Sequence, residues 1–289
     1  MLISLVICTQ NRCSTLRTCL EYVLRLQSPG EWELIVVNNG STDATSEVLA
    51  SFADKAPFRI VLVYEPKSGL GRARNAGIAK ATGEIVAFTD DDCYVSPDFL
   101  SRILEVFEDE KIGFMGGRVL LYDETDAPIT IRPETGIRWI EPYSFIRGEL
   151  VGANMAARRS LIEKIGGFDP ELGAGTPFPC EDVEFLARAS HTGVMGIYHP
   201  GSLVLHHHGR KPGKDDLARL KTYDYGRGAY YAKFILNPQT RIMLLKRWYW
   251  HARNEFPGLH YGTIFRELSG AVHYLLARLW QQGFRGSSS

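Results

Sequence analysis

Apolar and polar residues alternate in blocks along the first 120 or so positions of the chain. Continuous apolar runs rich in β-branched residues are typical of strands that are buried on both faces of a sheet. Four such runs occupy residues 2–8, 33–37, 59–64 and 84–89. Each is followed by a segment whose apolar residues recur at helical spacing. The order predicts an α/β fold with a Rossmann-like, mostly parallel central sheet flanked by helices.

This alternation stops after Leu121. Residues 122–148 are rich in proline, glycine and charge, and we expect them to form a long excursion over the site. The later pattern predicts two helices and two strands, and beyond Lys214 the sequence is mainly helical, basic and aromatic. We therefore predict a catalytic domain at residues 1–212, with halves at 1–121 and 122–212. A helical C-terminal extension at 213–285 and a short tag remnant at 286–289 follow it.

Composition narrows the class of protein. Of 289 residues, 45% are hydrophobic and 23% are charged, a balance typical of globular proteins. Lys plus Arg equal Asp plus Glu at 33 each, so no overall positive charge favours nucleic acid. Five cysteines without a Cys-x-x-Cys pair argue against a disulfide framework or a zinc knuckle. The apolar amino terminus is too short for a signal peptide, so we expect a cytoplasmic protein.

Polar residues gather where three of the predicted strands end. They are Thr9 to Arg12, Asn38 to Asp43, and Asp90 to Asp92. The carboxyl ends of strands in an open α/β sheet border the ligand crevice. Three consecutive carboxylates repel one another, so a divalent cation is expected among them, although an acidic turn beside a helix cap is the simpler alternative.

Several short motifs occur in a fixed order along the chain. They are Val6-Ile7-Cys8-Thr9-Gln10-Asn11-Arg12, Val36-Val37-Asn38-Asn39-Gly40-Ser41-Thr42-Asp43, Arg72-Ala73-Arg74-Asn75-Ala76-Gly77, Asp90-Asp91-Asp92, Gly166-Gly167-Phe168-Asp169, and Glu181-Asp182 followed by Arg188. Each motif alone is weak, but the ordered set is specific. Over roughly residues 1–210 the chain resembles family 2 glycosyltransferases of the GT-A fold.

The resemblance implies a nucleotide-diphosphate sugar donor (UDP-, GDP- or dTDP-linked) and Mg²⁺ or Mn²⁺ as cofactor. It implies that donor-binding residues are Thr9, Asn11, Arg12, Asn38, Asn39, Gly40, Gly71, Arg74, Asn75, Asp90 and Asp91. The expected metal ligands are Asp91 and Asp92, with His206 or His208, which strand alternation puts on one face. Asn38 replaces the aspartate common in the family, so the base stays open, and Asn38 and Asn39 could instead only shape a turn.

For catalysis the resemblance points to Asp182, which we expect to act as the base that accepts the proton of the acceptor hydroxyl. Glu181 and Trp139 are expected on the acceptor side. Both Glu181 and Asp182 open a predicted helix, where acidic residues also serve to interact with the helix dipole.

The last third of the chain combines basic and aromatic residues with an apolar helical pattern. These residues are Arg241, Lys246, Arg247, Trp248, Tyr249, Trp250 and Arg253, followed by Ile264, Leu268, Val272, Leu275, Leu276 and Leu279. This pattern favours a peripheral contact with the inner face of a membrane, which would suit a lipid-linked acceptor. A helical cap on the catalytic domain and a homodimer interface are the alternatives.

The leading hypothesis is a metal-dependent, inverting glycosyltransferase that acts on an acceptor hydroxyl of a glycan, glycolipid or small molecule. A sugar-phosphate nucleotidyltransferase is a second hypothesis, although no pyrophosphorylase-type loop rich in glycine and basic residues lies near the amino terminus. A catalytically silent subunit that binds nucleotide-sugars is the third. The acidic triad and Asp182 together favour the first.

Overall fold

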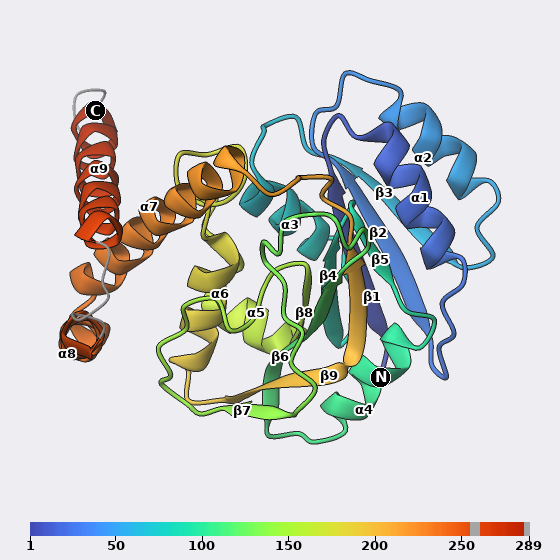
Figure 1. Cartoon of the computed structure of the whole chain (residues 1–289). Helices are drawn as coiled ribbons and strands as arrows, with labels where there is room; N and C mark the ends of the chain where they lie inside the picture. The colour runs from blue at the N-terminus through green and yellow to red at the C-terminus, as the bar shows by residue number, and fades with distance from the viewer. Residues whose placement is uncertain (255–260, 286–289) are drawn as a thin grey trace.

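The computed structural model describes residues 1–254 and 261–285, and within them nine strands form one mixed sheet (Figure 1). The strand order is β3 (Arg59–Tyr64), β2 (Trp32–Asn38), β1 (Ile3–Thr9), β4 (Ile85–Asp90), β8 (Asn154–Arg158), β6 (Ile112–Leu121), β9 (Met195–His206) and β5 (Cys93–Val95), with β7 (Arg138–Ile140) also paired to β9. The first four strands are parallel, as the sequence predicts. They bring the ends of β1, β2 and β4 to one edge.

The second half of the sheet mixes both directions. Strand β8 is antiparallel to β4 and β6, whereas β6 and β9 are parallel to each other. Sequence patterns predict neither β6 nor β8. The Ala-rich sequence of β8 has low strand propensity, and its burial between two strands overrides that preference. The sequence predicts two strands at 194–198 and 203–208, but they form the single strand β9, because a register irregularity accommodates Pro200-Gly201.

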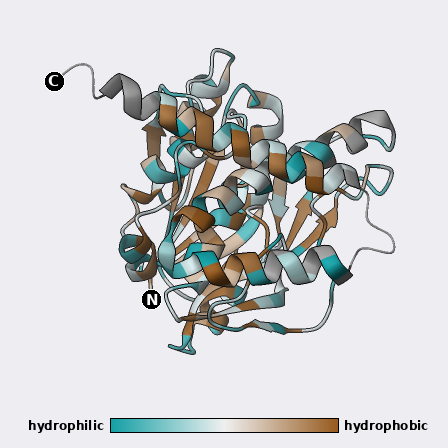
Figure 2. Ribbon diagram, turned by 90° about the vertical axis from the view of Figure 1, so that its left-hand side faces the viewer, coloured by the Kyte–Doolittle hydropathy of each residue, from teal (hydrophilic) through white to brown (hydrophobic). Residues whose placement is uncertain are grey.

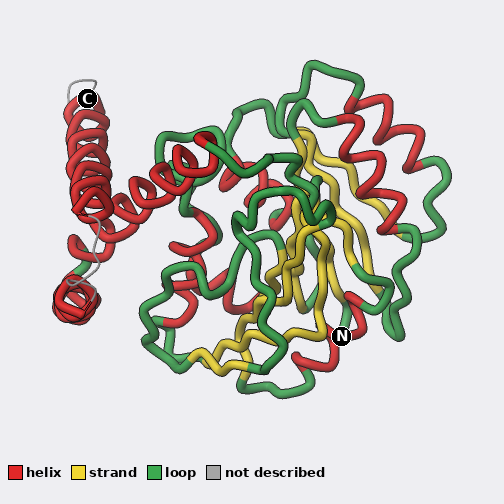
Figure 3. Tube along the Cα trace, in the orientation of Figure 1, coloured by secondary structure: helices red, strands yellow, loops and turns green. Residues whose placement is uncertain are grey.

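Helices cover both faces of the sheet, as predicted. Helices α1 (Cys13–Val23), α2 (Thr45–Ala53) and α4 (Phe99–Phe107) pack on one face, and α3 (Leu70–Ile78), α5 (Arg159–Ile165) and α6 (Glu181–Ser190) on the other. Side chains of β1 alternate between the two cores, with Leu5 and Ile7 in one and Val6 in the other. Figure 3 shows long loops meeting above one end of the strands, where the site lies.

Three helices end the chain: α7 (Lys214–Leu236), α8 (Pro238–Asn254) and α9 (Tyr261–Arg285). They project from one side of the sheet domain (Figure 1). Tyr230 and Phe234 of α7 are buried in the core beside α6, so α7 joins the arm to the domain. Gly228 of α7 and Gly270 of α9 lie against the backbone of the opposite helix, which lets the two helices pack closely. No described helix is both long enough and apolar enough to cross a bilayer.

Candidate active site

The polar strand ends surround a cavity of about 630 Å³. The parallel register places Cys8 beside Asp90 and Thr9 beside Asn38, so the loops that follow these strands converge. The predicted site residues that line the cavity are Thr9, Arg12, Asn39, Arg74, Asp90, Asp91, Asp92, Glu181, Asp182 and His206. Asn11, Asn38, Gly40, Gly71, Asn75, Trp139 and His208 are not among the lining residues.

Asp91 and Asp92 form a buried carboxylate pair around one cationic nitrogen. The Arg12 Nη1 atom lies 2.9 Å from Asp91 Oδ1 and 2.7 Å from Asp92 Oδ2. Burial raises the pKa of Asp91 to about 6, against the charge of Arg12. Burial opposes the ionisation of Asp92 too, but His206 and Arg12 hold its pKa below the usual range. Two carboxylate oxygens that share a cationic partner fit a hard divalent ion.

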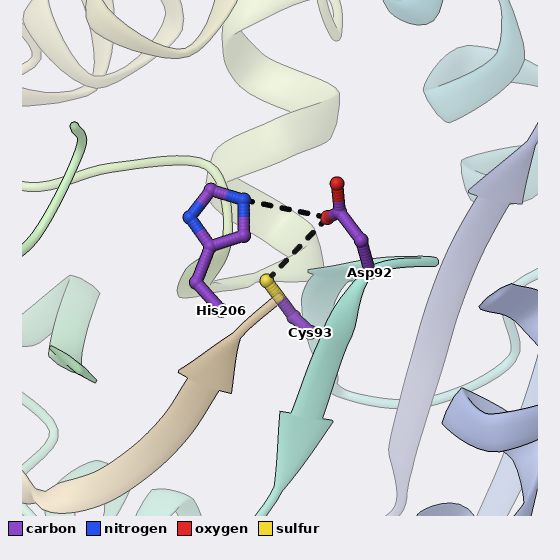
Figure 4. Close-up of side chains that lie close together, drawn as sticks. All are labelled: Asp92, Cys93 and His206. Atoms are coloured by element: carbon purple, nitrogen blue, oxygen red, sulfur yellow. Dashed lines mark hydrogen bonds and ion pairs between the residues drawn. The ribbon is translucent and has the colours of Figure 1, made fainter. Parts of the chain in front are cut away.

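His206 adds an imidazole to this pair. Cys93 of β5 and His206 of β9 are register partners, which brings the His206 Nε2 atom to 3.4 Å from Asp92 Oδ1 (Figure 4). The ligand atoms of Asp92, Cys93 and His206 lie within 4.8 Å of one another. Burial raises the pKa of the Cys93 thiol well above its usual value, so this sulfur stays protonated and ligates poorly. The two carboxylates and His206 therefore fit a cation best.

His208 lies on the same side of the chain as His206, as strand alternation predicts, and the two ring centroids are 4.9 Å apart. Its two ring nitrogens are nevertheless occupied by the backbone. His208 Nε2 lies 2.9 Å from the Ala127 carbonyl oxygen, and the Arg210 amide donates to Nδ1 at 3.0 Å. These contacts favour His206 over His208 as the histidine ligand, and they let His208 hold the loop that contains Ala127. A metal-binding role of His208 stays a prediction.

Arg74 is a buried cation that links two parts of the site. Its guanidinium contacts Glu181 Oε1 at 2.9 Å and Asp90 Oδ1 at 3.1 Å, and it lies over the Phe168 ring. Burial, and then the negative charge of Asp182, raise the pKa of Glu181 to about 7, although Arg74 opposes this shift. The ion pairs join the end of β4 to the start of α6, so Arg74 fixes the position of the Glu181-Asp182 pair.

Asp182 has a different environment from its neighbour Glu181. Its Oδ2 atom accepts the Gly152 amide at 2.8 Å, and its Oδ1 atom accepts the Val183 amide at 2.8 Å. The side chain is half-buried and lines the cavity, and no described cation forms an ion pair with it. Two neutral amides thus orient this carboxylate without neutralising its charge, which leaves it able to accept a proton.

The asparagines of the predicted donor site hold loops together. Asn38 accepts the Ser41 amide and donates to Ser46, while Asn39 donates to the Glu65 and Lys67 carbonyls and accepts the Gly69 amide. Asn11 accepts the Thr42 amide, and Asn75 pairs with both backbone groups of Phe168. These contacts agree with the turn-shaping alternative for Asn38 and Asn39. Their contact with a donor stays a prediction.

The two predicted glycines also have local roles. Gly40 has a φ of 70°, a left-handed conformation that glycine adopts without strain. A Cβ atom on Gly71 would lie 2.6 Å from the Asp169 carbonyl oxygen, so only glycine lets α3 approach that loop. Trp139 lies on β7 and is 49% exposed.

Sequence patterns miss four arginines that line the cavity. One is Arg210, and the other three, Arg132, Arg147 and Arg227, are here called the arginine group. Arg147 and Arg227 both contact Glu267 of α9, at 3.4 Å and 3.1 Å. Arg132 donates to the Ile131 and Gly148 carbonyls, and no described carboxylate forms an ion pair with it. Two of these arginines lie in the excursion between β6 and β8 and one on α7, so only the fold brings them together.

The family of the chain follows from comparison with known proteins. Residues 4–166, more than half of the chain, match the model of glycosyl transferase family 2, and the chain belongs to this family. An uncharacterized glycosyltransferase of Nostoc sp. is 31% identical over 59% of this chain and 55% of its own length. The probable glycosyltransferase YdaM of Bacillus subtilis is 29% identical over 70% of this chain and 50% of its own length. The chain thus spans about half the length of these relatives.

Solved structures of similar fold are glycosyltransferases. The mannosyltransferase PcManGT from Pyrobaculum calidifontis, in complex with GDP-Man and Mn²⁺, superposes with a TM-score of 0.67 at 21% identity, over 99% of this chain and 80% of its own. Residues 1–349 of TarS from S. aureus, in complex with UDP-GlcNAc, superpose with a TM-score of 0.63 at 16% identity, over 96% and 81%. The fold is therefore that of the GT-A glycosyltransferases.

Proposed function

We propose that the enzyme transfers a sugar from a nucleoside-diphosphate sugar to an acceptor hydroxyl, with inversion at the anomeric carbon and with the help of a divalent cation. The observation that carries this proposal is the separation of two carboxylate sites in one cavity. Asp91 and Asp92 share a cationic partner, whereas Asp182 is oriented by backbone amides alone. One site suits the charged donor and the other suits proton transfer. The GDP-Man and UDP-GlcNAc complexes of similar fold support a donor of this class.

Asp91, Asp92 and His206 would hold the cation. A bound Mg²⁺ or Mn²⁺ ion supplies charge neutralisation for a departing nucleoside diphosphate. Arg12 contributes to the same region because its guanidinium keeps the two carboxylates together. Arg74 maintains the distance between this region and the Glu181-Asp182 pair, because it is bonded to both Asp90 and Glu181.

Asp182 is the better of the two candidate bases. A single displacement that inverts the anomeric carbon needs a proton acceptor beside the attacking hydroxyl. Glu181 is bound to Arg74 in a buried ion pair, so its charge is already neutralised and its oxygen is occupied. The carboxylate of Asp182 borders the cavity and is held by the amides of Gly152 and Val183. Its orientation is therefore fixed before an acceptor binds.

The test compares Asp182→Asn with Asp98→Asn, a matched change at a solvent-accessible ion pair between Asp98, just before α4, and Arg102 of α4. We expect Asp182→Asn to lower kcat by about 100-fold or more, the range for loss of general-base catalysis. Donor binding should change little, as measured by the thermal shift that UDP, GDP or dTDP produces with Mn²⁺. The same panel identifies the base of the donor. A folded Asp182→Asn enzyme with nearly normal kcat would remove Asp182 from the reaction.

A further inference from the structure

The outward face of α9 is apolar over most of its length. Its strongly exposed side chains are Phe265 (72%), Leu268 (50%), Val272 (55%), Leu276 (59%), Leu279 (64%) and Trp280 (69%). Among the α9 side chains that the structure describes, none of the exposed ones carries a full charge, and the only exposed polar one is His273. Monomeric soluble proteins rarely expose an apolar stripe of this extent, so the face is expected to bind something.

Two charged side chains of α9, Arg266 and Glu267, contact α7 and the loop that contains Arg147. Glu267 is buried and contacts Arg147 and Arg227, and Arg266 forms an ion pair with Asp224 of α7 at 2.6 Å. These contacts fix the rotation of α9 about its axis. The exposure of the apolar stripe is therefore a consequence of the ion pairs and of the close packing on α7.

Helix α8 adds basic and aromatic residues to the same side of the molecule. Its sequence contains Arg241, Lys246, Arg247 and Arg253 and no Asp or Glu. Ile242, Leu245, Tyr249 and Trp250 are exposed along it. Figure 1 shows α8 and α9 at the outer end of the arm, and Figure 2 turns that side toward the viewer, where hydrophobic residues recur along both helices. We call this surface the α8–α9 face.

A second copy of the chain and a lipid bilayer are the two occupants to weigh for an apolar face of this size. A symmetric dimer through the α8–α9 face would bring α8 against α8 or against α9. Neither helix offers exposed acidic groups to the cations of α8 among the side chains that the structure describes. An anionic lipid surface instead provides negative headgroups for α8 and hydrocarbon for α9, and Trp and Tyr suit the interface between them.

We propose that the α8–α9 face docks on an anionic lipid bilayer, with both helices lying in the plane of the interface. Apolar area and basic residues both contribute to such binding. Helix α7 carries α8 and α9 and also lines the cavity through Asp224 and Arg227. Docking thus holds the cavity beside the headgroups. The inference concerns binding to lipid alone and does not depend on the reaction proposed above.

The test measures co-sedimentation of the full chain with vesicles, without donor or acceptor. Vesicles of phosphatidylcholine alone are compared with vesicles of equal parts phosphatidylcholine and phosphatidylglycerol. We expect the protein to bind the anionic vesicles more tightly, and added salt to weaken this binding. Lys246→Glu with Arg253→Glu should lower the affinity by at least about 25-fold, because each basic residue near such a surface contributes roughly fivefold. Leu268→Glu with Leu276→Glu should weaken binding to both kinds of vesicle.

Leu62→Glu is the matched control, since Leu62 is exposed to a similar degree (43%) on β3 at the far edge of the sheet. It should bind vesicles as the wild type does. Circular dichroism and sedimentation velocity check the fold and the oligomeric state of each variant. Wild-type protein that fails to bind anionic vesicles overturns the proposal. The proposal is also overturned if the wild type is a dimer that does not bind vesicles and that dissociates in Leu268→Glu. In that case a second copy of the chain occupies the α8–α9 face.

Discussion

The carboxylates and the arginine group line the same cavity, but their charges are compensated in different ways. Asp90, Asp91, Asp92 and Glu181 all have an arginine partner, either Arg12 or Arg74. In the arginine group, Arg147 and Arg227 both contact Glu267, and Arg227 also contacts Asp224. The hydrogen bonds of Arg132 go to the backbone carbonyls of Ile131 and Gly148. The first region thus has four carboxylates for two arginines and keeps an excess of negative charge, whereas the second has three arginines for two carboxylates.

This difference indicates that the two regions bind different groups. Desolvation of its guanidinium lowers the pKa of Arg132, although the charges of Glu134 and Glu149 oppose this shift. A substrate anion placed beside Arg132 would relieve that cost. The carboxylates, in contrast, outnumber their arginine partners and can accept a cation in addition. We therefore expect the metal-bound part of the donor near Asp91 and Asp92, and a second anionic group near Arg132.

The largest effect is expected from Asp92→Asn. The change removes a carboxylate that contacts both Arg12 and His206 and lowers the charge available to a cation. In the wild type, nucleoside diphosphate with Mn²⁺ at saturating concentration should raise Tm by about 5 °C or more. The variant should lose most of this shift, whereas Asp98→Asn should keep it. An Mn²⁺-dependent shift of full size in Asp92→Asn would show that the cation lies elsewhere.

A smaller effect is expected from Arg132→Gln, which keeps a hydrogen-bonding side chain and removes the charge. The KM for one substrate should rise by about 10- to 100-fold, the loss expected for one charge-assisted hydrogen bond. The Mn²⁺-dependent thermal shift should remain, because Arg132 has no contact with Asp91 or Asp92. Arg138→Gln, on β7 outside the cavity, is the matched control. If both KM values are unchanged in Arg132→Gln, no anion binds in the arginine group.

The pH dependence of stability tests how far the arginines compensate the charge of the carboxylates. The pKa of Glu181 is about 7 in the folded protein, above its ordinary value of 4.5, so the folded state holds this proton more tightly than the unfolded state. The contribution of Glu181 to stability is complete below about pH 4.5 and is lost as the pH rises through about 7, by at most about 3 kcal/mol.

Urea unfolding at about pH 5 and about pH 8 measures this loss. In Glu181→Gln the decline between the two pH values should be smaller, even if the variant is less stable at both because Arg74 loses its partner. The difference between the two pH values is the informative quantity, since the lost ion pair alone lowers both. An identical decline in wild type and variant would show that Arg74 keeps Glu181 ionised throughout.

The smallest effect is expected from Trp139→Ala. The sequence predicts Trp139 on the acceptor side, but the residue lies on β7 and does not line the cavity. Substitution should change kcat and KM by less than about twofold, within the range of an exposed surface change of up to 0.5 kcal/mol. A large rise in the KM of the acceptor would show that the acceptor binds across β7, outside both the carboxylate region and the arginine group.

Much of the site could be predicted because its residues follow strands in the sequence. Buried strands have continuous apolar patterns, and polar residues directly after them lie at one edge of a parallel sheet. That reasoning brings Thr9, Arg12 and Asp90 to Asp92 to the cavity, and the structure places them there. His206 is also predicted, and its pairing with Cys93 brings it to Asp92.

The other features depend on contacts between distant segments. The family resemblance and strand alternation leave His206 and His208 as equal candidates, but the ring nitrogens of His208 contact backbone groups of Ala127 and Arg210. Strand β8 lacks strand-forming residues and exists because β4 and β6 flank it. Short sequence patterns do not predict such contacts, because the stabilising energy comes from residues that are distant in the sequence.

The sequence alone determines the strand and helix order of the first half, the acidic cluster at its edge, and the family resemblance. Local propensity and hydrophobic period are properties of short segments, so a single chain reveals them. Only the tertiary structure decides that Glu181 forms an ion pair with Arg74, that Asp182 is held by two backbone amides, and that Arg132 donates to backbone carbonyls. Charge compensation depends on which groups meet within a few ångströms, and segments more than a hundred residues apart supply those groups.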